Sequence, residues 1–295
     1  MTRTDVPLPT PPSRPTGRAI VFCLLVIAGS WAFARVAATA GSITVTHGGL
    51  QVAAAFLTRA VAPALAYETD VPEGTAPLLV KAAKAAQTTV SFAAAAMTLA
   101  LTAGLLLTFF ASSVWWRDDD AAGARRFGSG RRVIAPVLYG ATRSVIAITR
   151  SIHELLWAVL LLAAFGLSHL TAVMAIAIPY AGILAKVFSE MIDEAPRDAA
   201  AAMRDAGASP LQVFFVGLVP RALPDMMAYA FYRFECALRS SAVLGFFGFP
   251  TLGYYIAASF ENLVYGEVWT YLYALFALVA AADWWSGALR RRFVA

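Results

Sequence analysis

Residues 88–116 read TTVSFAAAAMTLALTAGLLLTFFASSVWW and contain no charged side chain. A helix needs about 20 mostly apolar residues to cross the hydrocarbon core of a bilayer, and this run is longer than that. The whole chain has the same character, because 60% of its 295 residues are hydrophobic and 14% are charged. In soluble domains about 45–50% of the residues are apolar and about 25% are charged. We therefore predict an integral membrane protein, and the same composition excludes a disordered chain.

Five further runs have the length and composition of membrane spans. They cover residues 19–40, 133–167, 170–192, 223–247 and 268–289, and the run 133–167 is long enough to be bent or broken. The predicted fold class is an all-α integral membrane protein with six transmembrane helices. Residues 38–40 (ATA) resemble a signal-peptidase site, but the first apolar run is about 20 residues long, against about 7–15 in a signal peptide. Retention of this helix is favoured.

The predicted organisation begins with a disordered tail, residues 1–17, which is rich in Pro, Thr and Arg. The first transmembrane helix follows at 18–40 and an external segment at 41–86. In that segment Val52, Phe56 and Leu57 recur at helical spacing. This pattern fits a helix on the outer membrane surface or one packed on its own protein, and the sequence leaves both open. Residues 87–295 form the remaining membrane domain, with five spans.

Basic residues near span ends indicate orientation, because cytoplasmic loops carry an excess of Lys and Arg. With the N-terminus inside, the inside segments hold thirteen basic residues and the outside segments hold three. The inside set is Arg3, Arg14, Arg18, Arg117, Arg125, Arg126, Arg131, Arg132, Arg197, Arg204, Arg290, Arg291 and Arg292, and the outside set is Arg59, Lys81 and Lys84. Both termini are therefore predicted to be cytoplasmic. The net charge of +5 reflects topology, and no nucleic-acid partner is needed to explain it.

The sequence lacks the common catalytic motifs. It has no G-x-x-x-x-G-K-[ST], no H-E-x-x-H and no G-x-S-x-G pattern. Its histidines, His47, His153 and His169, are far apart, and two cysteines, Cys23 and Cys236, cannot form a four-ligand zinc site. We predict no catalytic residue, no cofactor and no metal in this chain.

Residues 193–224, DEAPRDAAAAMRDAGASPLQVFFVGLVPRALP, form the predicted cytoplasmic insert between spans four and five. Pro196 fits the first turn of a short helix that ends at Gly207, where a positive φ is expected. Ser209 and Pro210 then supply the N-cap and first turn of a second short helix, closed by Pro220 and Pro224. The result is a protruding knob (residues 195–220). Physics alone leaves open whether it binds a partner or is an ordinary helical loop.

This insert resembles the EAA loop of permease subunits in binding-protein-dependent ABC importers. That pattern is E-A-A, three residues, Gly, nine residues, Ile, one residue, Leu-Pro. Gly207 takes the glycine, Pro220 the proline and Ala202 an alanine, whereas Ala201, Gly217 and Val219 stand at the glutamate, isoleucine and leucine positions. Asp198 and Asp205 are the candidates to replace the missing glutamate. The resemblance implies an ATPase-coupling loop that includes Asp198, Ala202, Asp205, Gly207, Ala208, Ser209 and Pro220.

Two more segments resemble phosphonate-type permeases, the PhnE family. Residues 150–158, RSIHELLWA, match R-S-I-P-E-L-x-W-A with His153 in place of proline. Residues 232–235 (YRFE), 239–240 (RS) and 243–245 (VLG) match a Y-R-F-E…R-S-A-T-V-L-G run. The family continues G-A-G-G-I-G, whereas this chain reads GFPTLG at 248–253. The resemblance spans roughly residues 150–253.

The resemblance implies a permease of MetI-like fold that imports phosphonate or a related phosphorus oxyanion across the bacterial inner membrane. The permease domain is then residues 87–295. The implied partners are separate ATPase subunits that hold ATP and Mg, a second permease subunit (identical or homologous), and a periplasmic or lipid-anchored solute-binding protein. The rival hypothesis is an ATP-independent secondary transporter or channel for a small anion, which usually shows an internal repeat. A membrane enzyme is the third alternative.

Charged residues inside the predicted spans are candidates for a substrate pathway or for buried ion pairs, because a mid-bilayer charge seldom faces lipid. They are Arg143, Arg150, Glu154, Arg233, Glu235 and Arg239. Glu235 and Arg239 are four apart, in the order that favours a helical ion pair. Arg233 lies about 13 Å along a helix from Pro224, near the membrane centre. An arginine fork matches phosphorus oxyanions, but pairing of Arg233 with Glu154 is favoured slightly.

The topology is testable by cysteine labelling of intact cells. We expect Gly128→Cys and Gly207→Cys to react only after the membrane is opened, and Gly74→Cys to react from outside. Thr2 and Ala295 fusions should report a cytoplasmic location. Labelling of Gly128→Cys in sealed cells would contradict the six-span topology.

Overall fold

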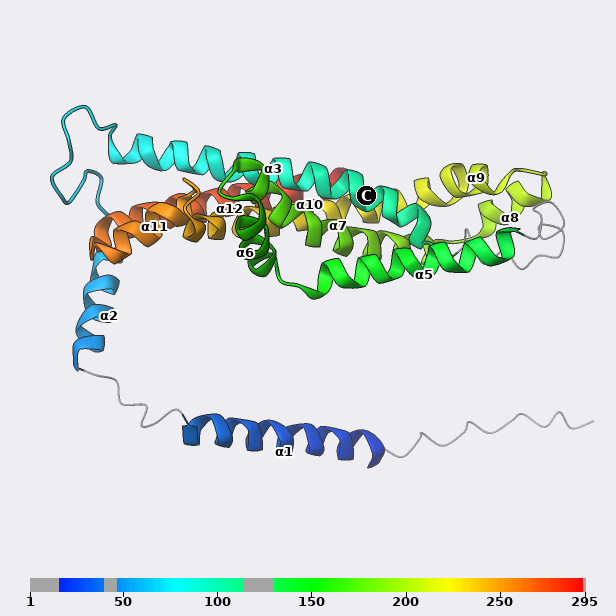
Figure 1. Ribbon diagram of the computed structural model, residues 1–295, viewed down its shortest axis with the longest axis horizontal. Coiled ribbons are helices and arrows are strands. Elements are labelled where there is room, and N and C mark those ends of the chain that lie inside the picture. The colour runs from blue at the N-terminus through cyan, green and yellow to red at the C-terminus, as the bar shows by residue number, and fades with distance from the viewer. Residues whose placement is uncertain (1–15, 40–46, 114–129, 294–295) are drawn as a thin grey trace, which may run out of the picture. The chain divides into compact units, whose positions relative to one another are not determined.

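The computed structural model describes residues 16–39, 47–113 and 130–293, and the regular elements in these ranges are helices (Figure 1). In chain order they are α1 (Thr16–Thr39), α2 (His47–Ala60), α3 (Leu78–Ala111), α5 (Gly130–Ser151), α6 (Glu154–Phe165), α7 (His169–Glu194), α8 (Asp198–Asp205), α9 (Pro210–Gln212), the π-helix η1 (Val213–Leu218), α10 (Val219–Val243), the 3-10 helix η2 (Leu244–Phe247), α11 (Leu252–Glu261) and α12 (Tyr265–Phe293). The chain forms two units, residues 1–54 and 55–295. The predicted tail lies mostly outside the described residues.

The all-helical prediction is confirmed. Five helices in the described ranges are long and apolar enough to cross a membrane, and a sixth span results if α5 and α6 form one broken crossing. The prediction that the third run is bent or broken is also confirmed, because α5 and α6 meet at 94°. Helix α3 begins at Leu78, ten residues before the uncharged run 88–116.

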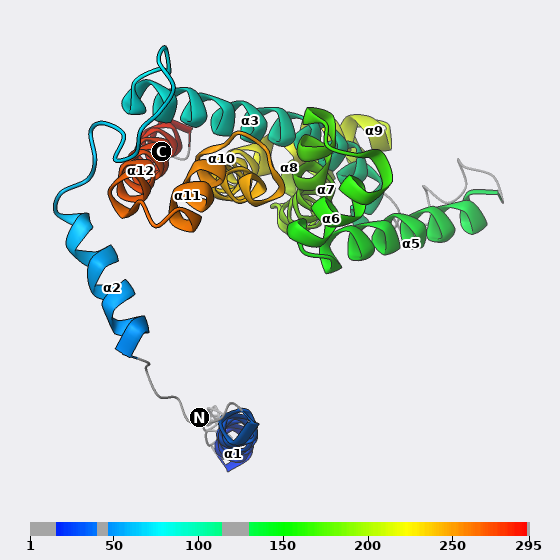
Figure 2. The ribbon, with the colours of Figure 1, turned by 60° about the vertical axis from the view of Figure 1, so that its left-hand side comes forward.

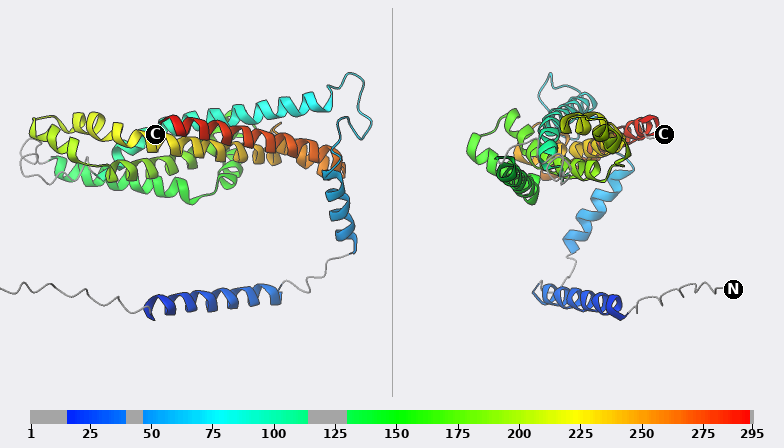
Figure 3. Two further views of the ribbon diagram at one scale, coloured as in Figure 1. Left: turned by 180° about the vertical axis from the view of Figure 1, so that it is seen from behind. Right: turned by 90° about the vertical axis from the view of Figure 1, so that its right-hand side faces the viewer.

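Helix α7 is central to the second unit, since α3, α5, α6 and α10 all pack against it (Figures 1 and 2). Small residues allow this close packing. Ala96 and Ala100 of α3 and Ala177 of α7 are buried in the shared core. At Gly182 a Cβ atom would lie 3.1 Å from the Thr149 Cβ of α5, so only glycine permits this approach. Helix α12 packs along α10 on the side seen from behind in Figure 3.

The break between α5 and α6 is held by side chains that replace helical hydrogen bonds. His153 has extended backbone angles (φ −65°, ψ 146°), and its Nδ1 accepts from the Leu155 N–H at 3.3 Å. The Trp157 Nε1–H donates to the Thr149 carbonyl at 3.2 Å, near the end of α5. Helix ends leave unpaired backbone groups, and in a bilayer these must find partners inside the protein. The His153 cap and the Trp157 bond meet that requirement.

Residues 56–77 dock onto the start of α12 through backbone and side-chain hydrogen bonds. The Phe56 ring packs against Phe260, Tyr265 and Trp269, and the Trp269 Nε1–H donates to the Phe56 carbonyl at 2.7 Å. Of the two alternatives for the 41–86 helix, the structure favours packing on its own protein for the end of α2.

An ionic contact strengthens this docking. Glu68 pairs with Arg59 at 3.2 Å and accepts from the Gly266 N–H, while the buried Glu267 accepts from the Glu68 N–H at 3.1 Å. Burial and the Glu267 carboxylate also raise the pKa of Tyr67. The segment is thereby fixed at the end of the bundle that carries α11, which we name the α11 end.

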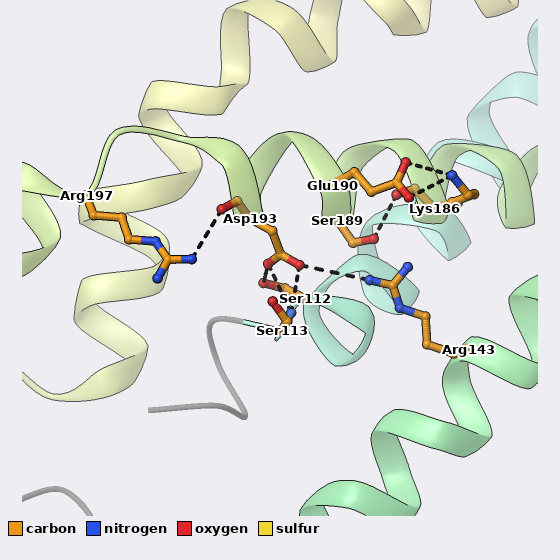
Figure 4. A network of polar contacts seen from close by, with 8 residues as sticks. All are labelled: Ser112, Ser113, Arg143, Lys186, Ser189, Glu190, Asp193 and Arg197. Atoms are coloured by element: carbon orange, nitrogen blue, oxygen red, sulfur yellow. Dashed lines mark hydrogen bonds and ion pairs between the residues drawn. The ribbon is translucent and has the colours of Figure 1, made fainter. Parts of the chain in front are cut away.

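Asp193 holds the opposite end of the bundle, the α8 end, together (Figure 4). Its carboxylate accepts from the Ser112 hydroxyl at 2.7 Å and from the Ser113 N–H at 3.0 Å, just after α3. The Arg143 Nη2 of α5 lies 4.0 Å from the same carboxylate. The C-termini of α3 and α7 are therefore fixed to each other and to α5 by one acidic side chain.

Replacement of Asp193 should destabilise the fold. Asp193→Ala leaves the partly buried Arg143 and Ser112 without this acceptor, and we expect a loss of about 2–4 kcal/mol in stability. Glu190→Ala is the matched control, since Glu190 pairs with Lys186 one turn away on the same helix at 2.7 Å, and its loss should cost under about 1 kcal/mol. Thermal unfolding of the two purified variants in detergent measures the difference. Equal midpoints would refute this role of Asp193.

Candidate functional site

The knob (residues 195–220) is shaped by two local capping motifs. Helix α8 ends in a Schellman motif, in which Gly207 N–H donates to the Arg204 carbonyl and Ala208 N–H donates to the Met203 carbonyl. Gly207 has φ +83°, as predicted. Ser209 and Gln212 then form a capping box, because the Ser209 N–H donates to Gln212 Oε1 at 2.8 Å and the Ser209 Oγ accepts from the Gln212 N–H at 3.4 Å. The predicted N-cap at Ser209 is confirmed.

Two details of the predicted knob are wrong. Pro196 precedes α8, whose N-cap is Arg197, because a proline favours extended backbone in the residue before it and Ala195 has ψ 143°. Pro220 and Pro224 do not close the second helix, which continues through η1 into α10. Proline cannot donate a hydrogen bond and crowds the carbonyl four residues earlier. The π turn, with Val219 N–H bonded to the Phe214 carbonyl, carries the helix past this obstacle.

The knob is attached firmly to the bundle while its outer residues stay exposed. Ala200 is buried in the main core and Met203 packs against it. Within the knob, Gly217 packs so closely on α8 that a Cβ would lie 3.2 Å from the Met203 sulfur. Ala208 packs on the main core. The remaining predicted coupling residues are exposed, namely Asp198, Ala202, Asp205, Gly207, Ser209 and Pro220. This arrangement presents two carboxylates and a glycine turn on a surface that is continuous with α10.

Near the middle of the bundle, Arg233 of α10 lies over the ring of Tyr180 of α7, with 4.3 Å from the guanidinium carbon to the ring centroid. Its Nε is buried and has no hydrogen-bond partner. Among the described residues, no carboxylate lies within 4.0 Å of its nitrogens. The predicted ion pair between Arg233 and Glu154 is therefore not formed. A cation–π contact stabilises the guanidinium but leaves its charge without a counter-ion.

Glu154 instead joins a chain of hydroxyl groups. The Ser240 hydroxyl donates to Glu154 Oε1 at 2.9 Å, and the Tyr180 hydroxyl lies 3.0 Å from the Ser240 Oγ. The His153 Nε2 lies 3.7 Å from Glu154 Oε2. These bonds connect α6, α10 and α7. We call Glu154, Tyr180, Arg233 and Ser240 the central cluster.

Of the other charged candidates, some form ion pairs and Arg150 is exposed. Glu235 and Arg239 form the predicted ion pair at 3.4 Å, and Arg143 pairs with Asp193. Arg150 is exposed near the end of α5, and among residues with described side chains no carboxylate pairs with it. The structure thus brings Glu154 and Arg233 to one cluster and places Arg143 at the α8 end.

Residues 248–253, where the chain departs from the resemblance, are packing residues. Phe249 is buried with its ring against Phe92, and the Thr251 hydroxyl donates to the Ala242 carbonyl at 3.0 Å. A separate cavity of about 500 Å³ lies between α3, α7, α10 and α12, and the side chains around it are apolar apart from Thr98. It cannot pair with an anion, since an unpaired charge is costly in apolar surroundings. The central cluster is the better candidate site.

Sequence reasoning missed Tyr180, Ser240 and Asp193 as parts of these polar groups. Ser240 directly follows Arg239 in the quoted RS pair, and Tyr180 follows the proline of its span. A hydroxyl or carboxylate within an apolar run is a usable signal, but its partner comes from a span distant in sequence. Asp193 sits at a helix end, where an acid is normally solvated.

The comparisons with known proteins agree with this architecture. Residues 127–294 match the family of the binding-protein-dependent transport system inner membrane component. The phosphite transport system permease protein PtxC of Stutzerimonas stutzeri is 35% identical over 161 residues, which cover 54% of this chain and 58% of that protein. The phosphate-import permease protein PhnE of Mycolicibacterium smegmatis is 30% identical over 159 residues, covering 54% of this chain and 30% of that protein. The chain thus spans less than two thirds of these relatives.

Solved structures show the same fold. The inward-facing MetNI methionine ABC transporter superposes with a TM-score of 0.61 at 19% identity, covering 74% of this chain and 99% of that one. An amino acid ABC transporter gives a TM-score of 0.57 at 16% identity, covering 72% of this chain and 94% of that one. Since the family match covers more than half of the sequence, this chain belongs to the binding-protein-dependent transport system inner membrane component family.

Proposed function

We propose that this chain is the permease subunit of an ATP-driven ABC importer and forms the pathway for phosphite, phosphonate or a related phosphorus oxyanion. Family membership supports the transporter class. The names of the relatives from Stutzerimonas stutzeri and Mycolicibacterium smegmatis support a phosphorus oxyanion as cargo. The chain itself is not an enzyme in this proposal, since ATP and Mg belong to a separate ATPase subunit.

The observation that carries the cargo assignment is the uncompensated guanidinium of Arg233. It lies beside the middle of α7, over Tyr180, and in the part of the chain that the structure describes no carboxylate lies within 4.0 Å of its nitrogens. A cation held at bilayer depth without a counter-ion attracts an anion to that depth, and the planar fork of arginine matches the oxygens of a tetrahedral oxyanion. Arg150, exposed in the last turn of α5 beside the break before α6, is a further cation that we assign to this route.

The exposed surfaces support the proposed partners. The knob would bind an ATPase subunit, with Asp198 and Asp205 as its acidic contacts and the α8 end in the cytoplasm. Arg150 is exposed within a membrane-spanning helix, where a second permease subunit would cover it because lipid cannot. A solute-binding protein would deliver the anion at the α11 end. The membrane would be the bacterial inner membrane, with both termini cytoplasmic.

An ATP-independent secondary transporter or channel is the less favoured alternative. It would require no coupling surface, yet the knob joins α10, the helix that carries Arg233, through a continuous helical path. A movement of the knob is therefore transmitted directly to the central cluster. Co-purification with an ATPase that carries a P-loop motif distinguishes the two.

The coupling role predicts a specific effect of Gly207→Val. A β-branched residue resists the φ of +83° found there, and open space around the position excludes a steric clash as the cause. We expect the Schellman turn to deform and co-purification of the ATPase subunit to fall at least severalfold, while membrane insertion persists. Gly74→Val is the matched control, because Gly74 has φ +92° and equally open surroundings. If Gly207→Val co-purified as much ATPase subunit as the wild type, docking at the knob would be contradicted.

The anion role predicts that Arg233→Gln slows uptake. Glutamine removes the charge and the fork, and loss of a charged hydrogen-bond partner corresponds to roughly a 10- to 100-fold decrease in transport. Arg239→Gln is the matched control on the same helix, since Arg239 is already paired with Glu235, and it should change uptake by less than about threefold. Uptake of labelled phosphite by cells with the complete importer measures both.

A structural role for Arg233 would give a different pattern. Arg233→Gln would then destabilise the complex in detergent, and the double variant with Glu154→Gln would restore stability and normal transport. That rescue would refute the anion role of Arg233.

A further inference from the structure

The central cluster combines two groups of opposite hydrogen-bonding character that do not neutralise each other. Arg233 can only donate, and the ionised carboxylate of Glu154 can only accept. They are connected through the Tyr180 ring and through the Tyr180–Ser240–Glu154 hydrogen bonds. Tyr180 and Ser240 lie between them, so the guanidinium and the carboxylate do not use each other as hydrogen-bond partners.

Glu154 retains acceptor capacity on the side that Ser240 does not use. Its Oε1 receives the Ser240 hydroxyl at 2.9 Å. Its Oε2 lies 3.7 Å from His153 Nε2, beyond hydrogen-bond distance, and 27% of the side chain is exposed. A ligand with a proton to donate can therefore reach this oxygen.

The two groups make different demands on an oxyanion. The guanidinium binds ionised oxygens, whereas the carboxylate repels any oxygen that does not supply a proton. Phosphite, phosphonate and phosphate have a P–O–H group in their monoanions. Sulfate has no such proton near neutral pH. A carboxylate beside the arginine weakens the binding of most anions. It strengthens binding only when the anion donates a hydrogen bond to that carboxylate.

We infer that Glu154 selects the cargo by its proton: the central cluster accepts a hydrogen-bearing phosphorus oxyanion, with ionised oxygens on Arg233 and the P–O–H donated to Glu154, and rejects oxyanions without that proton. This inference rests on the proposed function and assigns the specificity-determining residue within it. Ser240 orients the carboxylate, and Tyr180 holds the guanidinium.

The test uses the full chain assembled with its ATPase subunit in lipid nanodiscs and without a solute-binding protein, whose own selectivity would mask the result. Labelled methylphosphonate is the bound probe, at one neutral pH throughout. Unlabelled methylphosphonate, its monomethyl ester and sulfate are the competitors. The ester keeps one negative charge but has no P–O–H group. For the wild type we expect the ester and sulfate to compete at least tenfold more weakly than methylphosphonate.

In Glu154→Gln the amide can donate to an ionised oxygen, so the preference should shrink to within about threefold. Glu154→Asp keeps the carboxylate and should retain most of the preference, which separates this role from a loss of folding. Glu235→Gln is the matched control, since that carboxylate already pairs with Arg239, and it should preserve the full preference. Size-exclusion profiles check assembly of each variant.

Three outcomes would overturn the inference. They are equal competition by the ester in the wild type, an unchanged preference in Glu154→Gln, and absence of methylphosphonate binding to the assembled complex. Each of them leaves the proposed function standing if the complete importer still takes up phosphite through Arg233. Failure of that uptake would instead count against the proposed function itself.

Discussion

The close packing around α7 is the constraint on which the rest of the structure depends. Helices associate in a bilayer without a hydrophobic driving force between them, so small residues must bring their backbones together. Ala181 and Gly182 provide this on two faces of α7, toward Gly104 of α3 and Thr149 of α5. Because α7 is held so tightly, Tyr180 has a fixed position, and the residues of α6 and α10 that contact it are positioned in turn.

The break at His153 brings Glu154 into the central cluster. A straight span from α5 into α6 would carry Glu154 along the axis of α5, whereas the 94° turn brings it beside Ser240 of α10. The turn is possible because His153 caps α6 through its own Nδ1, so the backbone groups exposed by the break find partners within the protein. The residue that departs from the phosphonate-type pattern thus still performs the structural task of ending one helix and starting another.

The sequence was sufficient for features that depend on local chemistry. Apolar run length predicted the spans, Gly207 the positive φ, and Ser209 the helix cap, since each is determined by neighbouring residues. It failed where two remote segments meet. Pairing of Arg233 with Glu154 was favoured on charge alone, but the ring of Tyr180 and the hydroxyl of Ser240 lie between them. Closure of the second knob helix by Pro220 failed because a π turn, which has no local sequence rule, carries α10 past it.

The arginines of the membrane domain differ in whether a carboxylate pairs with them, and this difference decides which of them can bind an anion. Arg143 and Arg239 each have a carboxylate partner, so their charges hold helices or turns together and are not available to a passing anion. Arg233 has an aromatic ring instead, which supports the cation without neutralising it. A fully paired cluster would be stable but unattractive to an anion, and a cluster without Tyr180 would leave the guanidinium unsupported in a low-dielectric region. The contact with Tyr180 supports the guanidinium and leaves its charge available to an anion. Arg233 lies on α10, the helix whose N-terminal end is continuous with the knob.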